Sequence, residues 1–269
     1  DDKGQPQWSK LLGLAPMLPA SLAAMPDASA IVAGEAGVSP ARDGVLARID
    51  VSGTVIWDKA VDSGVDERIL GVAVGPNGGI AFAGVRHVNV AVHAHWYGRV
   101  DPKGNVLWQR TPQNPDLTTL DTILIGEEGS LALSGERMVL GKPVPALLRA
   151  DGDGTPIWTR TYAGPGGMAL EYRRDCLSAR PAGGFTLVTL GLPADGKPGK
   201  TLWGIRTDAS GYASCNGPGV CADKVGNGTC DDANPCTIDW CEAKGGCQHT
   251  PANAITCGAG KTCEAGVCK

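Results

Sequence analysis

The sequence lacks the long hydrophobic stretch that a membrane helix needs, because no apolar run approaches about 20 residues. It also lacks an excess of basic charge: 19% of its 269 residues are charged, and the formal net charge is -4. Without a basic surface, binding to nucleic acid or to an anionic membrane is not expected. The sequence therefore predicts neither a membrane span nor a nucleic-acid partner.

Motifs of the common enzyme classes are absent as well. The chain has no Gly-x-Ser-x-Gly nucleophile motif, no complete phosphate-binding loop and no His-Glu-x-x-His pair. Only four histidines are present, which limits acid–base chemistry and catalytic triads. We therefore predict no catalytic residue and no cofactor, apart from the calcium ion considered below.

Glycine and proline, by contrast, are abundant, with 39 and 19 residues. Short runs of valine, isoleucine and leucine interrupt them regularly, which is typical of an all-β protein with many tight turns rather than of a disordered chain. The chain opens on Asp1-Asp2-Lys3-Gly4 without an initiator methionine. We interpret this as a mature N-terminus after export, although a boundary chosen for expression would look the same.

A motif, Arg-x-Asp-x-x-Gly, occurs four times along the chain with periods of 51, 50 and 57 residues. The four copies begin at Arg48, Arg99, Arg149 and Arg206. Seven residues after the aspartate of each copy stand Trp57, Trp108, Trp158 and Cys215. Strand-like runs bounded by turn residues precede each motif, for example Ile69–Val74 and Gly79–Gly84. Each period therefore predicts about four short strands, the pattern of a propeller blade.

The residues of this motif have structural roles in our interpretation. The aspartate caps a β-turn with its side chain, and the glycine supplies the positive φ that ends the turn. The motif is thus predicted to mark the hairpin between the third and fourth strands of each blade. The tryptophan is expected to pack against neighbouring strands or against the next blade.

This arrangement resembles the tryptophan-docking blades of the pyrroloquinoline-quinone-like propellers, whose motif is Asp-x-x-(Thr)-Gly-x-x-x-Trp. The resemblance covers roughly residues 5–217 and implies a propeller fold. It does not imply the quinone cofactor. The quinoenzymes have about twice as many blades, and this chain has no adjacent Cys-Cys pair of the kind seen at their cofactor site.

The N-terminal residues repeat the end of a blade. Residues 5–10 resemble residues 54–59, and Trp8 precedes Trp57 by 49 residues, about one period. We therefore predict an all-β, four-bladed propeller over residues 1–217, closed by the N-terminal strand, which completes the last blade and removes two sheet edges. An open arc whose N-terminal strand completes a blade of another copy is the alternative. Cys176 and Cys215 are predicted to pair and to fasten the fourth repeat.

Eight of the ten cysteines lie in residues 218–269, which we predict to be a separate small disulfide-rich module. Their spacing describes two four-cysteine units: Cys221, Cys230, Cys236 and Cys241, then Cys247, Cys257, Cys263 and Cys268. No Cys-x-x-Cys pair occurs, so disulfides are favoured over a zinc site. Eight cysteines allow about 105 connectivities, and the pairing stays open. Disulfides predict an oxidising compartment: the protein is secreted and extracellular, periplasmic or exposed on a cell surface.

The first of these units, from Cys230 to Thr250, resembles the slime-mould-type cysteine repeat. That family occurs in extracellular matrix proteins and in large secreted bacterial proteins, so the resemblance implies a surface or matrix location and no activity. The second unit keeps the cysteine spacing but lacks the aspartates.

Two groups of side chains could hold a metal ion. Hard oxygen ligands for Ca²⁺ are offered by Asp231, Asp232, Asn234 and Asp239, which could instead cap turns. Imidazole ligands for Zn²⁺ or Cu²⁺ are offered by His87, His93 and His95, the latter two on one face of a strand by alternation. The alternative for the histidines is the polar side of an exposed strand.

These features favour a secreted, non-enzymatic binding or scaffolding protein that engages a protein or glycan through its propeller loops. A structural subunit that polymerises into a surface filament or matrix by sharing its N-terminal strand is the second hypothesis. A propeller enzyme, either a quinone-type oxidoreductase or a lyase, is the third.

Overall fold

The computed structural model describes most of the chain. The described residues are 3, 5–12, 17–38, 41–61, 64–89, 92–111, 117–126, 128–139, 142–162, 169–171, 177–180, 183–192, 201–211, 213, 234, 236–242, 246–251, 256–258 and 261–269. They form two compact units, one of residues 1–113, 119–133 and 149–156, the other of residues 114–118, 134–148 and 157–269.

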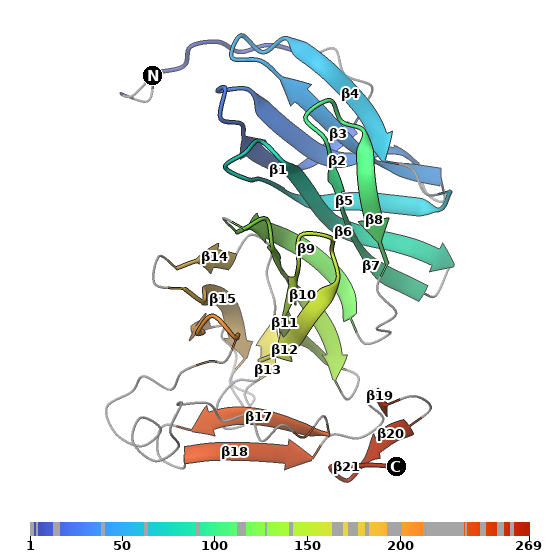
Figure 1. Cartoon of the computed structure of the whole chain (residues 1–269), viewed down its shortest axis with the longest axis vertical. Coiled ribbons are helices and arrows are strands. Elements are labelled where there is room, and N and C mark those ends of the chain that lie inside the picture. Colours follow the sequence, from blue (N-terminus) through green and yellow to red (C-terminus); the bar gives the residue numbers. More distant parts are fainter. Residues whose placement is uncertain are drawn as a thin grey trace. The chain divides into compact units, whose positions relative to one another are not determined.

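The first two repeats each form a four-stranded antiparallel sheet with the strands in chain order (Figure 1). The first sheet consists of β1 (Met17–Ala24), β2 (Ala30–Val38), β3 (Ala41–Ile49) and β4 (Val55–Val61). The second consists of β5 (Asp66–Val74), β6 (Ile80–Asn89), β7 (Val92–Val100) and β8 (Val106–Arg110). The prediction of four short strands per period is confirmed for these repeats.

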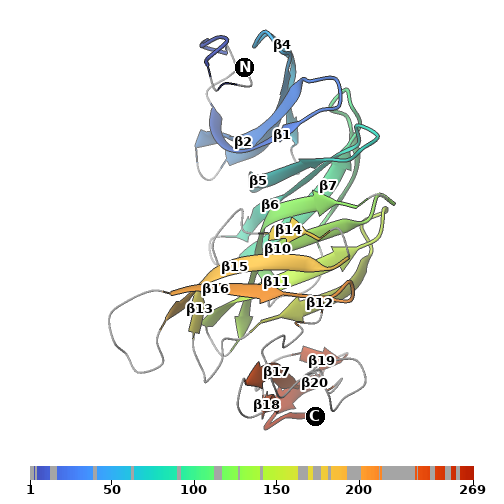
Figure 2. The same ribbon diagram turned by 90° about the vertical axis from the view of Figure 1, so that its left-hand side faces the viewer.

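The third repeat follows the same plan and the fourth departs from it. The third sheet consists of β9 (Leu117–Ile125), β10 (Leu131–Val139), β11 (Lys142–Ala150) and β12 (Pro156–Thr161). In the fourth sheet, two short strands, β13 (Ala169–Glu171) and β14 (Leu177–Ala179), pair with successive parts of β15 (Phe185–Leu192). On its other side β15 pairs with β16 (Thr201–Arg206), and Figure 2 shows these two strands side by side.

The fourth sheet bears on the predicted closure of the propeller. Among the described residues directly after β16, up to residue 213, there is an isolated bridge between Thr207 and Ala213 and no fourth strand of this sheet. The N-terminal residues 5–12, predicted to supply that strand, have no strand conformation in the described structure. Four-stranded propeller-like sheets are thus confirmed, whereas closure of the ring by the N-terminus stays a prediction. Cys176 and Cys215 lie outside the described residues.

The two ends of the sheets are built differently. At one end, here called the constant end, all seven hairpins between described strands connect through five residues, as in 25–29 and 50–54. At the other, the variable end, the connections between strand bounds range from two residues, as in 39–40, to eight in 193–200. The Arg-x-Asp-x-x-Gly motif belongs to the constant end, as predicted, because its turns join β3 to β4, β7 to β8 and β11 to β12.

The core of the first unit lies between its first two sheets. Leu46, Ile69, Phe82 and Trp96 are each 0% exposed and belong to one apolar cluster. The rings of Phe82 and Trp96 meet edge to face with centroids 4.7 Å apart. Alternating strand residues thus point into a shared core, as expected for stacked sheets.

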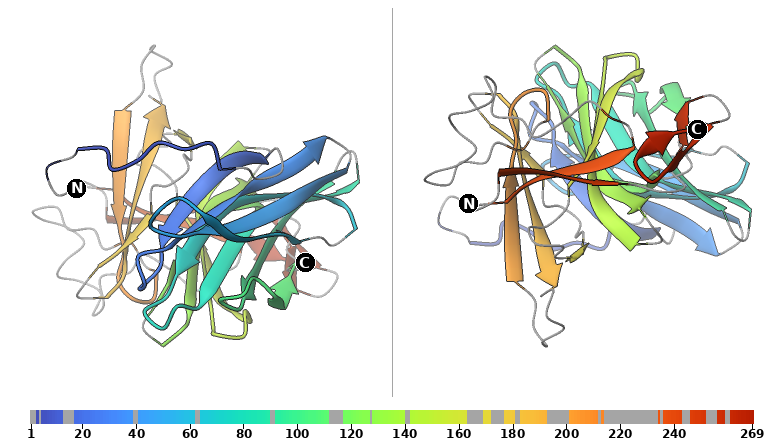
Figure 3. Two further views of the ribbon diagram at one scale, coloured as in Figure 1. Left: turned by 90° about the horizontal axis from the view of Figure 1, so that it is seen from above. Right: turned by 90° about the horizontal axis from the view of Figure 1, so that it is seen from below.

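The C-terminal segment contains two small sheets stapled by disulfides. One is a hairpin of β17 (Thr237–Glu242) and β18 (Gly246–Pro251), seen as neighbouring strands in Figure 3, in which Cys241 stands opposite Cys247. The other consists of β19 (Thr256–Gly258), β20 (Lys261–Glu264) and β21 (Val267–Cys268). The predicted boundary between residues 217 and 218 lies outside the described residues. Within the part of the chain that the structure describes, no helix has the length and apolar character to cross a membrane.

Candidate binding surface

The tryptophans of the repeat link each sheet to the next at the constant end. The indole Nε1 of Trp57, in β4, donates a 3.1 Å hydrogen bond to the carbonyl of Pro102, and its ring lies against Gly104. Trp108 lies against Gly154 in the same way, and Trp158 against Gly211. The expectation that these tryptophans pack against the next blade is confirmed, and their partner is the Asp-x-x-Gly turn.

Trp8 repeats this contact ahead of the first sheet. Its Nε1 donates a 2.7 Å hydrogen bond to the carbonyl of Val51, and its ring lies against Gly53. The sequence likeness between residues 5–10 and 54–59 is therefore matched by the same docking geometry.

The turn aspartates hold their hairpins through backbone N–H groups. Oδ1 of Asp101 accepts hydrogen bonds from the N–H of Asn105 at 2.8 Å and of Lys103 at 2.9 Å. These bonds lower the pKa of Asp101 below its ordinary value, and the bond from Asn105 has the largest effect. The corresponding bonds from Thr54 and Ser52 lower the pKa of Asp50. The capping role predicted for the motif aspartate is thus seen in the structure.

Two buried tyrosines reinforce the same turns, and the sequence reasoning missed both. The hydroxyl of Tyr97 donates a 2.8 Å hydrogen bond to the carbonyl of Gly154, and that of Tyr162 donates one of 2.8 Å to Gly211. Burial raises the pKa of Tyr97 to about 12 and raises that of Tyr162 as well. Both hydroxyls therefore stay protonated donors across the physiological pH range. The two tyrosines stand at different positions of their repeats, so no periodic signal marks them.

A cluster of charged side chains lies at the variable end of the first two sheets. Arg42 at the start of β3 binds the Asp66 carboxylate through two hydrogen bonds, Nε to Oδ1 at 2.9 Å and Nη2 to Oδ2 at 3.1 Å. Its Nη1 lies 3.6 Å from Glu35, and Arg68 lies 3.4 Å from the other oxygen of Glu35. The hydrogen bond with Asp66 is the main cause that raises the pKa of Arg42 above its ordinary value. The cluster joins the first sheet to β5 at this end.

The predicted histidine group falls partly within this cluster. His87 lies 3.8 Å from Asp66 and 3.5 Å from Arg68, whereas His95 is completely buried. His87 stands directly opposite His93 across β6 and β7. His93 and His95, which were predicted to share a face by alternation, both lie in β7. The side chain of His93 lies outside the described residues. The interpretation of these residues as the polar side of an exposed strand does not hold for His95.

Of the predicted calcium ligands, the structure describes Asn234 and the backbone of Asp239. The Oδ1 of Asn234 accepts a 3.0 Å hydrogen bond from the N–H of Cys236, and its Nδ2 donates one of 3.0 Å to the carbonyl of Gly266. Asn234 thus acts in a turn and as a link to the chain end. Asp239 lies in β17 opposite His249. Asp231 and Asp232 lie outside the described residues, so a calcium site stays a prediction.

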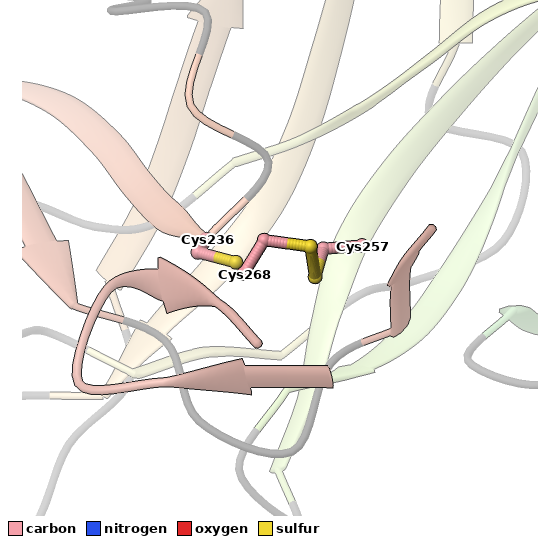
Figure 4. Close-up of side chains that lie close together, drawn as sticks. All are labelled: Cys236, Cys257 and Cys268. Carbon is pink, nitrogen blue, oxygen red and sulfur yellow. A yellow bond between two sulfur atoms is a disulfide. The ribbon is translucent and has the colours of Figure 1, made fainter. Parts of the chain in front are cut away.

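Three sulfur atoms come together in the C-terminal segment. The Sγ atoms of Cys236, Cys257 and Cys268 lie within 4.8 Å of one another (Figure 4). They belong to two disulfides, Cys236–Cys263 and Cys257–Cys268. Disulfide sulfurs are not the thiolates that bind zinc, so this group of sulfur atoms reflects two neighbouring disulfide bonds and not a zinc site. Disulfides are thereby confirmed for these four cysteines, while Cys221 and Cys230 lie outside the described residues.

Several solved structures resemble the chain, all at low identity. A protein of unknown function from Bacteroides caccae is 13% identical, with a TM-score of 0.46, over 79% of this chain and 69% of the other. An α-L-arabinofuranosidase from Clostridium thermocellum is 10% identical, with a TM-score of 0.39, over 73% and 70%. The gluconolactonase XC5397 from Xanthomonas campestris is 14% identical, with a TM-score of 0.39, over 74% and 79%. At this level of identity the likeness concerns only the fold.

Comparison of sequences adds one local result. No curated protein sequence matches the chain. Residues 229–252 match the family described as the Dictyostelium (slime mold) repeat, which agrees with the resemblance of the first four-cysteine unit and suggests an extracellular location.

Proposed function

We propose that this chain is a secreted, non-enzymatic binding or scaffolding protein that engages a protein or a glycan through the connections at the variable end of its sheets. The contrast between the two ends carries the proposal. Turns of constant length, docked tryptophans and capping aspartates make one end a repeated support. Connections of differing length lie at the other end, and binding residues are commonly placed on such loops over a rigid scaffold.

The charged cluster supports binding rather than catalysis at this end. The carboxylates of Glu35 and Asp66 lie against the guanidinium groups of Arg42 and Arg68. Carboxylates engaged in this way are held in fixed positions, which suits a preformed surface. The cysteine repeat, in turn, suits a rugged spacer or adhesion unit outside the cell.

The binding proposal is tested with one substitution at each end. Val38, at the end of β2, is 79% exposed at the variable end, and Val51 is 63% exposed at the constant end. Screening the protein against glycan and extracellular-protein arrays is expected to give a ligand whose affinity falls at least tenfold in Val38→Asp and stays within twofold in Val51→Asp. A ligand that is lost only in Val51→Asp would place binding at the wrong end and contradict the proposal.

The docking of Trp8 favours a second candidate, a structural subunit. Trp8 docks on the first sheet as the tryptophan of a preceding blade would, while β16 pairs only with β15 among the described strands. Leu202 in β16 is 74% exposed. The N-terminal segment could complete its own fourth sheet and close the ring, or complete that of a second copy and form a filament.

Light scattering of the non-reduced protein over a concentration series separates these two pairings. A mass near 27.6 kDa at every concentration is expected if the segment closes its own ring. A mass that grows with concentration, and returns to the monomer value in Trp8→Ala, would favour the structural subunit. The same growth in Trp8→Ala would show that association does not use the N-terminal segment.

A further inference from the structure

The arginine of the repeated motif has polar partners in the first hairpin of its own sheet. In the first sheet, Arg48 reaches the hairpin of residues 25–29. Its Nη2 lies 2.5 Å from the carboxylate of Asp27, and its Nε donates a 2.9 Å hydrogen bond to the hydroxyl of Ser29. This hairpin thus supplies a carboxylate and a hydroxyl to the guanidinium, whose Nη1 donates a further hydrogen bond of 3.0 Å to the carbonyl of Pro102.

The third sheet repeats this pattern. Its first hairpin, residues 126–130, has the same backbone hydrogen bonds as residues 25–29. Glu128 and Ser130 therefore stand where Asp27 and Ser29 stand. Arg149 donates a hydrogen bond to the hydroxyl of Ser130, and the charge of Glu128 acts on it electrostatically.

The second sheet is the exception. Its hairpin, residues 75–79, again has the same backbone bonds, but Asn77 stands in place of the carboxylate and Gly79 in place of the serine. The arginine here, Arg99, donates a hydrogen bond to the carbonyl of Gly129 in the next hairpin. Its buried Nε has no hydrogen-bond partner among the described residues. Both acceptors that the other sheets provide within the hairpin are thus missing.

A shallow hollow lies at this exception. It opens to solvent and lies between the first hairpins of the second and third sheets. Its lining consists of Gly75, Pro76, Asn77, Gly79, Arg99, Ile125, Gly126 and Gly129. A Cβ atom placed on Gly79 would lie 3.7 Å from Nη1 of Arg99, so the guanidinium faces the space that a serine would occupy.

We propose that this hollow is a binding site for a carboxylate group of a ligand, which would bind Arg99 as the carboxylate of Asp27 binds Arg48. A planar guanidinium with free donors matches a carboxylate with two oxygens. The Asn77 amide adds a further donor at the rim.

The motif arginine of the fourth sheet differs from Arg99 in its exposure. Gly184 stands at the serine position, but the motif arginine, Arg206, is exposed and solvated. Arg206 therefore provides a matched control, because its removal changes the net charge by the same amount as removal of Arg99.

The test uses the full chain and two carboxylate probes at constant ionic strength. Sodium glucuronate represents an acidic glycan and N-acetylaspartate amide represents an acidic peptide, with glucose as the neutral control. The readout is the amide NMR shift of Gly78, Gly79, Gly126 and Gly129. Saturable shifts are expected with at least one carboxylate and not with glucose. The probe that binds more tightly shows whether the carboxylate comes from an acidic glycan or from an acidic peptide. Binding of either probe supports the site.

Three variants with the same change of charge decide whether the hollow is responsible. Asn77→Asp supplies the missing internal carboxylate and is expected to weaken binding at least tenfold, as is Arg99→Gln, while Arg206→Gln stays within twofold. If Arg99→Gln fails to fold, Asn77→Asp still decides, because it restores the arrangement of the first sheet. Equal affinity in Asn77→Asp and the unmodified protein would overturn the proposal, as would shifts no larger than those from chloride. The site lies at the constant end, so its failure would leave the Val38→Asp experiment unaffected.

Discussion

Replacing Gly154 with alanine is expected to lower the free energy of unfolding by about 3 kcal/mol, because the new methyl group meets two obstacles at once. Gly154 has a φ of 78°, in the left-handed region that favours glycine. A Cβ atom at this position would also lie 2.5 Å from the ring of Trp108. The ring has little room to retreat, because it packs edge to face against the fully buried Tyr97, with centroids 6.0 Å apart.

Gly64→Ala separates the two causes of this loss. Gly64 has a φ of 84°, but no atom lies within 4 Å of a Cβ placed there. Its replacement should therefore cost only the backbone strain, about 1 kcal/mol. Urea unfolding followed by tryptophan fluorescence measures both variants. Equal losses would mean that the docked tryptophan adds nothing to the stability of the turn.

The repeat made most of this architecture predictable. A motif that recurs with a nearly constant period repeats one local structure, so the turns, the strand count and the docking role of the tryptophans followed from it. The fourth sheet was harder to predict. Its period is longer, Cys215 stands at the tryptophan position, and its first strand is split into β13 and β14. Once the pattern changes, strand boundaries depend on tertiary pairing that local sequence does not report.

The charged cluster of Glu35, Arg42, Asp66 and Arg68, by contrast, could not be predicted from the repeat. Arg42 and Asp66 are 24 residues apart and lie in different sheets. Neither belongs to the repeated motif, so no spacing links them before the sheets are placed together. The histidines show a related limit. Strand alternation predicts which face a side chain is on, but it does not predict how deeply that face is buried, and His95 lies in the core.

The sequence shows the residues that replace the carboxylate and the hydroxyl partners of Arg99, but it does not show what they replace. Asn77 and Gly79 look like ordinary turn residues. Only the shared backbone hydrogen bonds of the hairpins reveal that Asp27 with Ser29, and Glu128 with Ser130, occupy equivalent positions beside an arginine. A repeat protein thus supplies its own internal comparison, in which a departure from the pattern points to a possible site.

Trp96→Ala is expected to be the most damaging substitution in the core, with a loss of about 3–5 kcal/mol in the free energy of unfolding. The side chain is 0% exposed and packs edge to face on Phe82. Gly44 of the first sheet provides the space for its ring, because a Cβ there would lie 3.0 Å from the indole. Truncation would therefore leave a cavity between two sheets that cannot readily close.

The docking tryptophans should matter less than Trp96, although they belong to the motif. Trp57 is only half-buried, so Trp57→Ala removes less packed surface and is expected to cost about 1–3 kcal/mol. Leu107→Ala, at a side chain that is 63% exposed, should stay within about 0.5 kcal/mol and provides the control. Urea unfolding should rank the three variants in this order. A larger loss for Trp57→Ala than for Trp96→Ala would show that the docking contacts, rather than the core between the first two sheets, dominate the stability of the repeats.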